Sequence, residues 1–205
     1  MEFLKKLMIL TMVLLSSTAI AQDFNSLQIA FSKSISYESK ADYKNAIEAI
    51  KTVHSGNNYE TNMRLGWLNY LAGNFTDSES YYEKAAILMP ASVEALWGLA
   101  YPLAELKKWN SLSGVYKKIL KLDPKNTTAN YRLGLSAYYS KDYITAKKYF
   151  DIVLGLYPMD YNSLLMNAWT NYFLGKKTDA KILFNKVLMV APTDSSAKEG
   201  LALLK

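Results

Sequence analysis

The side chains that carry out covalent or metal chemistry are few in this sequence of 205 residues. It contains no cysteine, which excludes disulfides, thiol catalysis and cysteine-ligated metals. His54 is the only histidine, and it lies in a predicted loop of serine, glycine and asparagine residues. Serines and carboxylates therefore have no plausible histidine partner, and no P-loop, dinucleotide-binding glycine pattern or nucleophile elbow is present. We predict that the chain is not an enzyme and uses no cofactor or metal.

Basic residues exceed acidic ones, which gives the chain a formal net charge of +6. Much of the excess occurs as adjacent lysines, including Lys107-Lys108, Lys117-Lys118, Lys147-Lys148 and Lys176-Lys177. A solvated outer face is the simplest interpretation of such pairs, and an anionic partner or a membrane surface is the alternative. Hydrophobic residues make up 50% of the chain, so it can fold around a sizeable core.

The first residues have the parts of a secretory signal peptide. Lys5 and Lys6 precede an apolar stretch over residues 7–15, and Ala19-Ile20-Ala21 forms a small-x-small ending. We therefore predict a signal peptide over residues 1–21, cleavage before Gln22, and a bacterial protein that is periplasmic or secreted. An uncleaved membrane anchor is the alternative. No second apolar stretch is long enough to span a bilayer, so no integral membrane span is expected after cleavage.

Four of the five prolines recur at one fixed spacing, and this spacing defines the elements of the chain. Pro90, Pro124, Pro158 and Pro192 are each 34 residues from the next. Proline cannot continue a helix, so each one closes a unit. The register predicts units over residues 59–92, 93–126, 127–160 and 161–194. We expect an atypical first unit over residues 22–58 and a capping helix over residues 195–205.

Other columns agree with this register. A small residue recurs on the first helix of each unit, and an aromatic residue recurs on the second helix. The small column is Gly66, Ala100, Gly134 and Ala168, and the aromatic column is Tyr82, Tyr116, Phe150 and Phe184. The small residue lets the second helix approach closely, and the aromatic ring fills the space beside it. Gly73 and Gly175 fall at the predicted turns, where glycine tolerates a left-handed backbone.

The period, the Leu65-Gly66 and Leu133-Gly134 pairs and the closing prolines resemble the tetratricopeptide repeat. The stretches RLGWLNYLAGNFTDSESYYEKAAILMP and YRLGLSAYYSKDYITAKKYFDIVLGLYP are close to its consensus. The resemblance covers residues 24–205. It implies an all-α fold, a right-handed α-solenoid of stacked antiparallel helix hairpins.

Pro102 departs from the repeat pattern, because it falls inside a predicted first helix. An interior proline costs about 3 kcal/mol or more and bends the helix. Gly98, four residues earlier, would give the crowded backbone some room. We interpret Pro102 as a tolerated local bend, and a deliberate widening of the groove is the alternative.

The resemblance also implies where a partner binds, because the first helices of this family line its concave surface. Met63, Trp67, Tyr70 and Leu71 correspond to those positions in the first regular unit. The following units supply Trp97, Tyr101 and Glu105; Tyr131, Leu135, Tyr138 and Tyr139; and Leu165, Trp169, Tyr172 and Phe173. Packing between neighbouring units would account for some of these aromatic residues. An excess that stays exposed usually marks a contact surface.

We therefore predict a non-catalytic adaptor or scaffold of the cell envelope that holds a peptide or helix of a partner protein in an aromatic groove. A structural protein that self-assembles into homo-oligomers is the alternative. The lysine and asparagine clamp of some family members is not found, since Tyr37 rather than asparagine stands one helical turn after Lys33. An apolar peptide or amphipathic helix is the expected ligand. Nucleic acid is not expected, because the basic residues fall mainly on second helices and turns.

Overall fold

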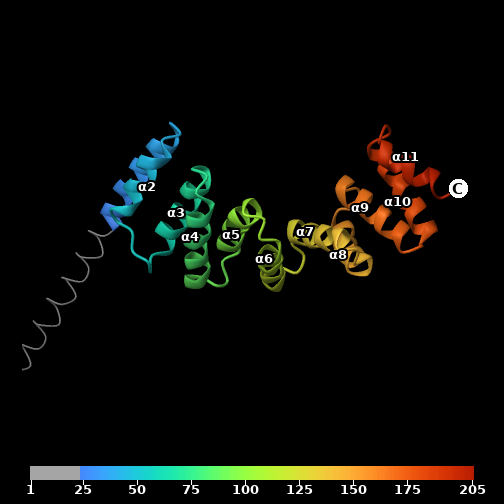
Figure 1. The fold of residues 1–205 in the computed structure, drawn as a ribbon, viewed down its shortest axis with the longest axis horizontal. Helices are drawn as coiled ribbons and strands as arrows, with labels where there is room; N and C mark the ends of the chain where they lie inside the picture. Colours follow the sequence, from blue (N-terminus) through green and yellow to red (C-terminus); the bar gives the residue numbers. More distant parts are fainter. Residues whose placement is uncertain (1–23) are drawn as a thin grey trace, which may run out of the picture. The chain divides into compact units, whose positions relative to one another are not determined.

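The computed structural model describes residues 24–205, which form helices throughout and no strand (Figure 1). Residues 24–38 are helical, and ten further helices follow in chain order. They are α2 (Tyr43–Lys51), α3 (Tyr59–Leu71), α4 (Phe75–Leu88), α5 (Val93–Glu105), α6 (Trp109–Leu122), α7 (Thr127–Tyr139), α8 (Tyr143–Leu156), α9 (Tyr161–Phe173), α10 (Lys177–Val190) and α11 (Ser195–Ala202). The predicted signal peptide and its cleavage site before Gln22 lie outside the described residues.

The helices repeat with the period that the prolines set. First helices begin at Tyr59, Val93, Thr127 and Tyr161, and each has 13 residues. Second helices begin at Phe75, Trp109, Tyr143 and Lys177, and each has 14 residues. This arrangement confirms the predicted all-α stack of antiparallel helix hairpins.

A polar side chain caps each first helix and also α11. Each capping oxygen accepts a hydrogen bond from the backbone N–H three residues later, which satisfies a donor that the helix itself leaves unpaired. The caps are Asn58, Ser92, Asn126, Asp160 and Asp194. Except for Asn58, the capping residues stand two residues after the closing prolines, so one turn ends a hairpin and starts the next.

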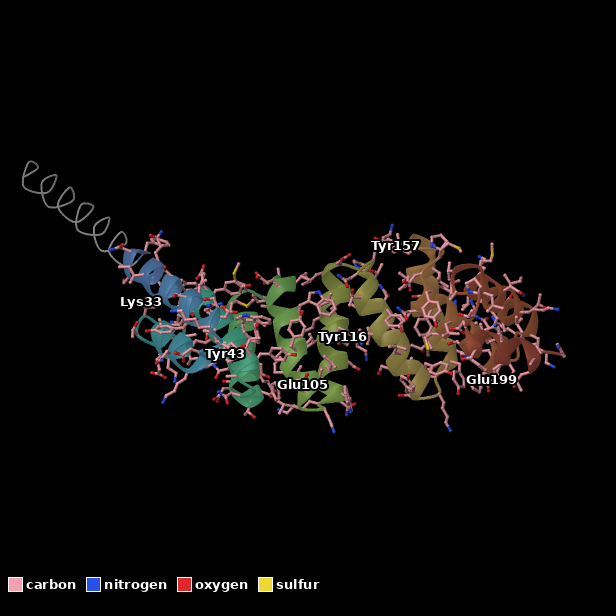
Figure 2. The ribbon with its side chains drawn as sticks, turned by 90° about the horizontal axis from the view of Figure 1, so that it is seen from above. Lys33, Tyr43, Glu105, Tyr116, Tyr157 and Glu199 are labelled. Atoms are coloured by element: carbon pink, nitrogen blue, oxygen red, sulfur yellow. The ribbon has the colours of Figure 1, made fainter. Side chains whose placement is uncertain are left out.

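The chain divides into two compact units, residues 1–107 and residues 108–205. We call them unit 1 and unit 2. Unit 1 has a core of Ala46, Ile50, Leu65 and Leu68, with Tyr81 packed against it. The core of unit 2 is centred on α9 and α10 and includes Leu164, Ala168, Ala180, Phe184, Val187 and Ala197. Figure 2 shows the side chains of both units, with Tyr157 projecting at the edge of unit 2.

The small residues of the first helices provide the predicted close approach. A Cβ on Gly66 would lie 2.8 Å from the Tyr82 ring, and one on Gly134 would lie 2.6 Å from Phe150 Cε1. Both rings are buried. Any side chain at these glycines would overlap the ring, so the second helix would have to move away.

Pro102 lies inside α5, as the sequence predicted, and it is buried. Gly98 does not simply leave room for the proline. A Cβ on Gly98 would overlap the Tyr82 ring, which therefore occupies the space that a side chain at position 98 would take. Gly98 thus lets α4 pack closely against α5. Within residues 24–205 no helix is long and apolar enough to cross a membrane.

Candidate protein-binding groove

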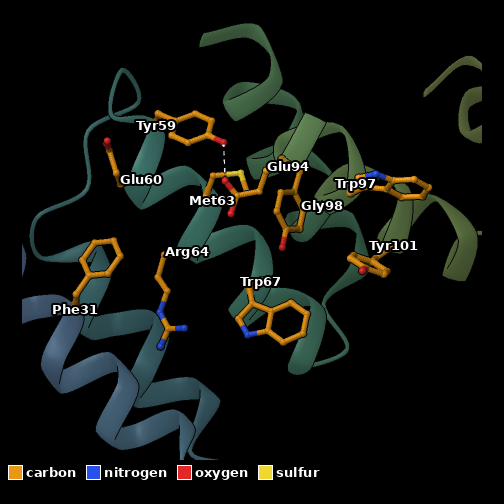
Figure 3. A pocket seen from close by; sticks show the side chains of 11 residues that line it. Phe31, Tyr59, Glu60, Met63, Arg64, Trp67, Glu94, Trp97, Gly98 and Tyr101 are labelled. Carbon is orange, nitrogen blue, oxygen red and sulfur yellow. Dashed lines mark hydrogen bonds between the residues drawn. The ribbon is translucent and has the colours of Figure 1, made fainter. Parts of the chain in front are cut away.

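A groove of about 510 Å³ lies in unit 1 (Figure 3). Its walls come from α3 and α5, with Phe31 from the first described helix and Tyr82 from α4. The lining residues from α3 are Tyr59, Glu60, Met63, Arg64 and Trp67, and those from α5 are Glu94, Trp97, Gly98 and Tyr101. Residues three, four and seven apart share one face of a helix, so each helix presents a continuous stripe to the groove.

Aromatic rings pack on one another beside the groove. Trp67 stacks on Tyr70 with 5.9 Å between ring centroids, and Tyr70 in turn lies 5.5 Å from Tyr101. The Trp67 Nε1–H donates a hydrogen bond of 2.8 Å to Glu38 Oε1. The polar atom of this indole is therefore satisfied, and the ring is held in place while it stays only partly buried.

Arg64 is fixed by the same glutamate. Its Nη1 lies 2.6 Å from Glu38 Oε2, and its Nε–H donates to Ser34 Oγ at 3.1 Å. The third nitrogen, Nη2, is buried and has no acceptor in the described part of the chain. The Glu38 carboxylate balances the charge of Arg64, so this pair adds no net charge to the groove.

The edge of the groove is acidic. Glu60 and Glu94 are exposed, and they occupy the same position in consecutive units. The Tyr59 hydroxyl lies 2.8 Å from Ser92 Oγ and donates a longer hydrogen bond of 3.4 Å to Glu94 Oε2. Because the Arg64 charge is balanced, the carboxylates leave the groove net negative.

Burial disfavours ionisation of the tyrosines around the groove. Burial raises the pKa of Tyr70, and the nearby Glu105 carboxylate raises it further. Burial also raises the pKa of Tyr82, whose ring lies against Gly66 of α3 and Gly98 of α5. These phenols therefore stay neutral at physiological pH and supply apolar ring faces and hydroxyl donors.

The groove brings together four of the predicted binding residues, Met63, Trp67, Trp97 and Tyr101. Tyr70 does not line the groove, but its ring stacks on Trp67, and Glu105 lies near Tyr70. Leu71 is half-buried and does not line the groove. The remaining lining residues were not predicted as binding residues; they are Phe31, Tyr59, Arg64, Tyr82, Gly98 and the two glutamates of the acidic edge. Glu60 and Glu94 are 34 residues apart, so the register contained a signal for them.

The predicted residues of unit 2 form an aromatic cluster instead. Tyr143 and Phe173 stack at 4.9 Å, and Tyr138 packs edge-on against both. Trp169 lies 5.1 Å from Phe184, and its Nε1–H donates to Ser196 Oγ of α11 at 2.8 Å. Trp169 therefore contributes to packing against the capping helix. Tyr139 and Phe173 are exposed, and the half-buried members are Tyr131, Leu135, Tyr138, Leu165, Trp169 and Tyr172.

His54 has a packing role in the structure. Its Nδ1 lies 3.0 Å from Thr61 Oγ1, and its ring meets Tyr81 edge-on at 5.6 Å. Burial lowers its pKa, so the neutral imidazole is favoured. Residues 24–205 contain no cluster of three or more histidine, aspartate or glutamate side chains that could hold a metal ion.

The hairpin register and the groove between first helices define the tetratricopeptide-repeat fold, and solved structures share it. A crystal structure of MamA superimposes with a TM-score of 0.69 at 21% identity, covering 80% of this chain and 91% of MamA. A tetratricopeptide repeat protein from Parabacteroides merdae gives a TM-score of 0.73 at 23% identity, covering 88% of this chain and 72% of that protein. No family model and no curated protein matches the chain. These likenesses show the fold.

Proposed function

We propose that the protein is a non-catalytic scaffold that holds a segment of a partner protein in the groove of unit 1. The observation that carries the proposal is the set of partly exposed aromatic rings that line the groove, Trp67 from α3 and Trp97 and Tyr101 from α5. Tryptophan and tyrosine are enriched at binding hot spots, because they bury large apolar area with little loss of side-chain freedom. The likeness to tetratricopeptide-repeat structures supports the proposal.

The charges at the groove favour a partner segment with a basic residue next to apolar ones. An apolar peptide or one face of an amphipathic helix would cover the rings. A lysine or arginine in that segment would meet Glu60 or Glu94 and could also lie over the face of an indole. If the predicted signal peptide exports this protein, the expected ligand is another exported protein of the cell envelope.

Trp97 provides the experimental test. The chain from Gln22 carrying Trp97→Ala should lose the partners that the wild-type protein captures from envelope extracts, because truncating a central aromatic costs about 2 kcal/mol or more. Trp109→Ala is the matched control, since Trp109 is 60% exposed and lies on α6, outside the groove. Equal capture by both variants would contradict the groove as the binding site. Circular dichroism should show that both variants keep the wild-type helix content.

Self-association is a second candidate, favoured by the uneven distribution of charge. Unit 1 contains nine basic and eleven acidic residues, whereas unit 2 contains fifteen basic and seven acidic ones. Their formal charges are therefore −2 and +8, and unit 2 of one copy would attract the acidic groove of another. The mass of the chain from Gln22 in micromolar solution tests this. A monomer at low ionic strength, where the attraction is strongest, would exclude it.

A further inference from the structure

The second helices of unit 2 carry most of its lysines. Helices α6, α8 and α10 contain eight lysines and only two acidic residues, Asp151 and Asp179. Lys147 is paired with Asp151 at 2.7 Å, which leaves seven lysines against one carboxylate. The second helices of unit 1 differ, because α4 carries Asp77, Glu79 and Glu83 against a single lysine, Lys84, and α2 carries only Lys44 and Lys51 against Glu48. The large lysine excess is therefore found on the second helices of unit 2.

Aliphatic side chains are exposed among these lysines. On α8, Ile144 is 64% exposed, and Lys148 and Ile152 follow at intervals of four residues on the same outward stripe. On α10, Ile182 and Met189 are 52% and 73% exposed. A face that only needs to be soluble gains nothing from isoleucine at such positions, and neither does a face that binds the phosphates of a nucleic acid.

Two of the helices that carry these residues border the same groove. Helices α8 and α10 flank a second groove of about 330 Å³, and α9 forms its floor through Leu164, Asn167 and Asn171. Helix α6 is the second helix of the preceding repeat, as α8 and α10 are the second helices of theirs. The outward residues of these three equivalent helices make up a set that we call the lysine face. It consists of the outward residues of α6, α8 and α10, including Lys117, Lys118, Lys121, Lys148, Lys181 and the aliphatic residues between them.

We propose that the lysine face binds the surface of an anionic phospholipid bilayer. Lysines interspersed with exposed aliphatic side chains are the composition of membrane-surface helices. The ammonium groups would meet lipid phosphates, while the aliphatic side chains enter the boundary between headgroups and acyl chains. The +8 charge of unit 2 supplies the long-range attraction. No residue of the lysine face lines the groove of unit 1, so this proposal does not depend on the proposed partner binding.

Sedimentation with lipid vesicles tests the proposal at physiological ionic strength. The chain from Gln22 contains every described residue and lacks the apolar stretch that would itself insert into lipid. It should bind vesicles that mix phosphatidylcholine with phosphatidylglycerol and should not bind vesicles of phosphatidylcholine alone. No binding to the anionic vesicles, or equal binding to both kinds, would overturn the proposal.

Two variants separate a membrane from other anionic partners. Lys148→Glu with Lys181→Glu should weaken vesicle binding by at least about tenfold, because each lysine near an anionic surface contributes substantially. Ile144→Ser with Ile182→Ser should also weaken it by about tenfold, while binding to a duplex oligonucleotide stays unchanged. If the isoleucine variant binds vesicles like wild type, the lysine face is a general polyanion surface and the membrane proposal is wrong.

The matched control lies in unit 1. Lys44→Glu with Ile87→Ser changes the same residue types at exposed positions, and Ile87 is 76% exposed. This control should bind anionic vesicles as the wild-type protein does. A loss as large as that of the isoleucine variant would show that binding is not specific to the lysine face and would also overturn the proposal.

Discussion

Three residues other than glycine adopt the left-handed backbone at the turns between helices. Ala41, Lys107 and Lys141 have φ values of 56°, 55° and 62°, where Gly73 and Gly175 have 78° and 73°. Side chains with a Cβ are strained in this region, and glycine is not. The sequence predicted a left-handed residue only where glycine stands, because alanine and lysine give no local signal for this conformation. At the other three turns the hairpin imposes the conformation.

Replacing one of these lysines should stabilise the protein. Lys141→Gly removes the strain at the turn, but glycine also makes the unfolded chain more flexible, which opposes folding. The net effect expected is a gain of about 0.5–1 kcal/mol in the free energy of unfolding. Thermal unfolding followed by circular dichroism measures it as a higher midpoint. Lys148→Gly, at an exposed position within α8, is the control and should lower stability by about 1 kcal/mol. A lower midpoint for both variants would contradict the argument.

The buried tyrosines predict a loss of stability at alkaline pH. Burial raises the pKa of Tyr82 above its value in the unfolded chain, so the folded state binds more protons once the pH exceeds about 10. Stability from this group is complete below that pH and falls as the pH rises toward the folded pKa. Chemical unfolding over a pH series should show this fall, and Tyr82→Phe should make it shallower. An unchanged slope in the variant would show that other groups cause it.

The resemblance to the tetratricopeptide repeat predicted the aromatic residues of the groove but not their polar partners. It assigned Met63, Trp67, Trp97 and Tyr101 to the concave surface, and all four line the groove. The contact between Trp67 and Glu38 was not predicted, because Glu38 belongs to the atypical first unit, where the spacing departs from 34. The hydrogen bond from Trp169 to Ser196 likewise depends on how α11 packs.

At the scale of helices, the small residue on each first helix determines how closely the second can approach. The structure confirms the column at Gly66 and Gly134, where the rings of Tyr82 and Phe150 occupy the space. The beginnings of α5, α7, α9 and α11 also followed from sequence, since a closing proline stands shortly before each one. Helix α10 begins at Lys177, where the other second helices begin with an aromatic residue, and Ala180 and Phe184 pack it into the core.

Gly134→Leu should separate α7 from α8. The new side chain would overlap the Phe150 ring, and overpacking of this kind typically costs about 1–3 kcal/mol. The measurement is the free energy of unfolding in urea. Gly155→Leu is the matched control, because Gly155 lies within α8 and a side chain there meets no atom within 4 Å. The control should be as stable as wild type or slightly more stable; equal stabilities for both variants would refute the packing assignment.

At the scale of the whole molecule, the 34-residue period does not predict the division into two units. The boundary between residues 107 and 108 falls between the first and second helices of one sequence repeat. The period describes how each hairpin is built, whereas the division depends on which helices pack together in one core. The two units also differ in the sign of their formal charge. The charged residues are spread along each unit, so no short motif in the sequence reveals the difference.

The amino terminus of the protein as it occurs in the cell provides a test of the predicted export. If residues 1–21 are a signal peptide, N-terminal sequencing of the protein recovered from the cell envelope should begin at Gln22. The small residues Ala19 and Ala21 fit the site that a signal peptidase recognises. Recovery of a chain that still begins at Met1 would instead favour an uncleaved membrane anchor and would restrict the protein to the bilayer surface.

The Tyr82 ring lies between two glycines of different hairpins, Gly66 on α3 and Gly98 on α5. One edge of the ring closes its own hairpin, and the other edge joins that hairpin to the next. In a linear array, cooperativity depends on how much of the folding energy resides in contacts between neighbours. A single side chain that serves both contacts links them, so neither hairpin can open without exposing the same ring. Helices α3, α4 and α5 should therefore exchange their amide hydrogens as one block, and Tyr82→Ala should let them open independently.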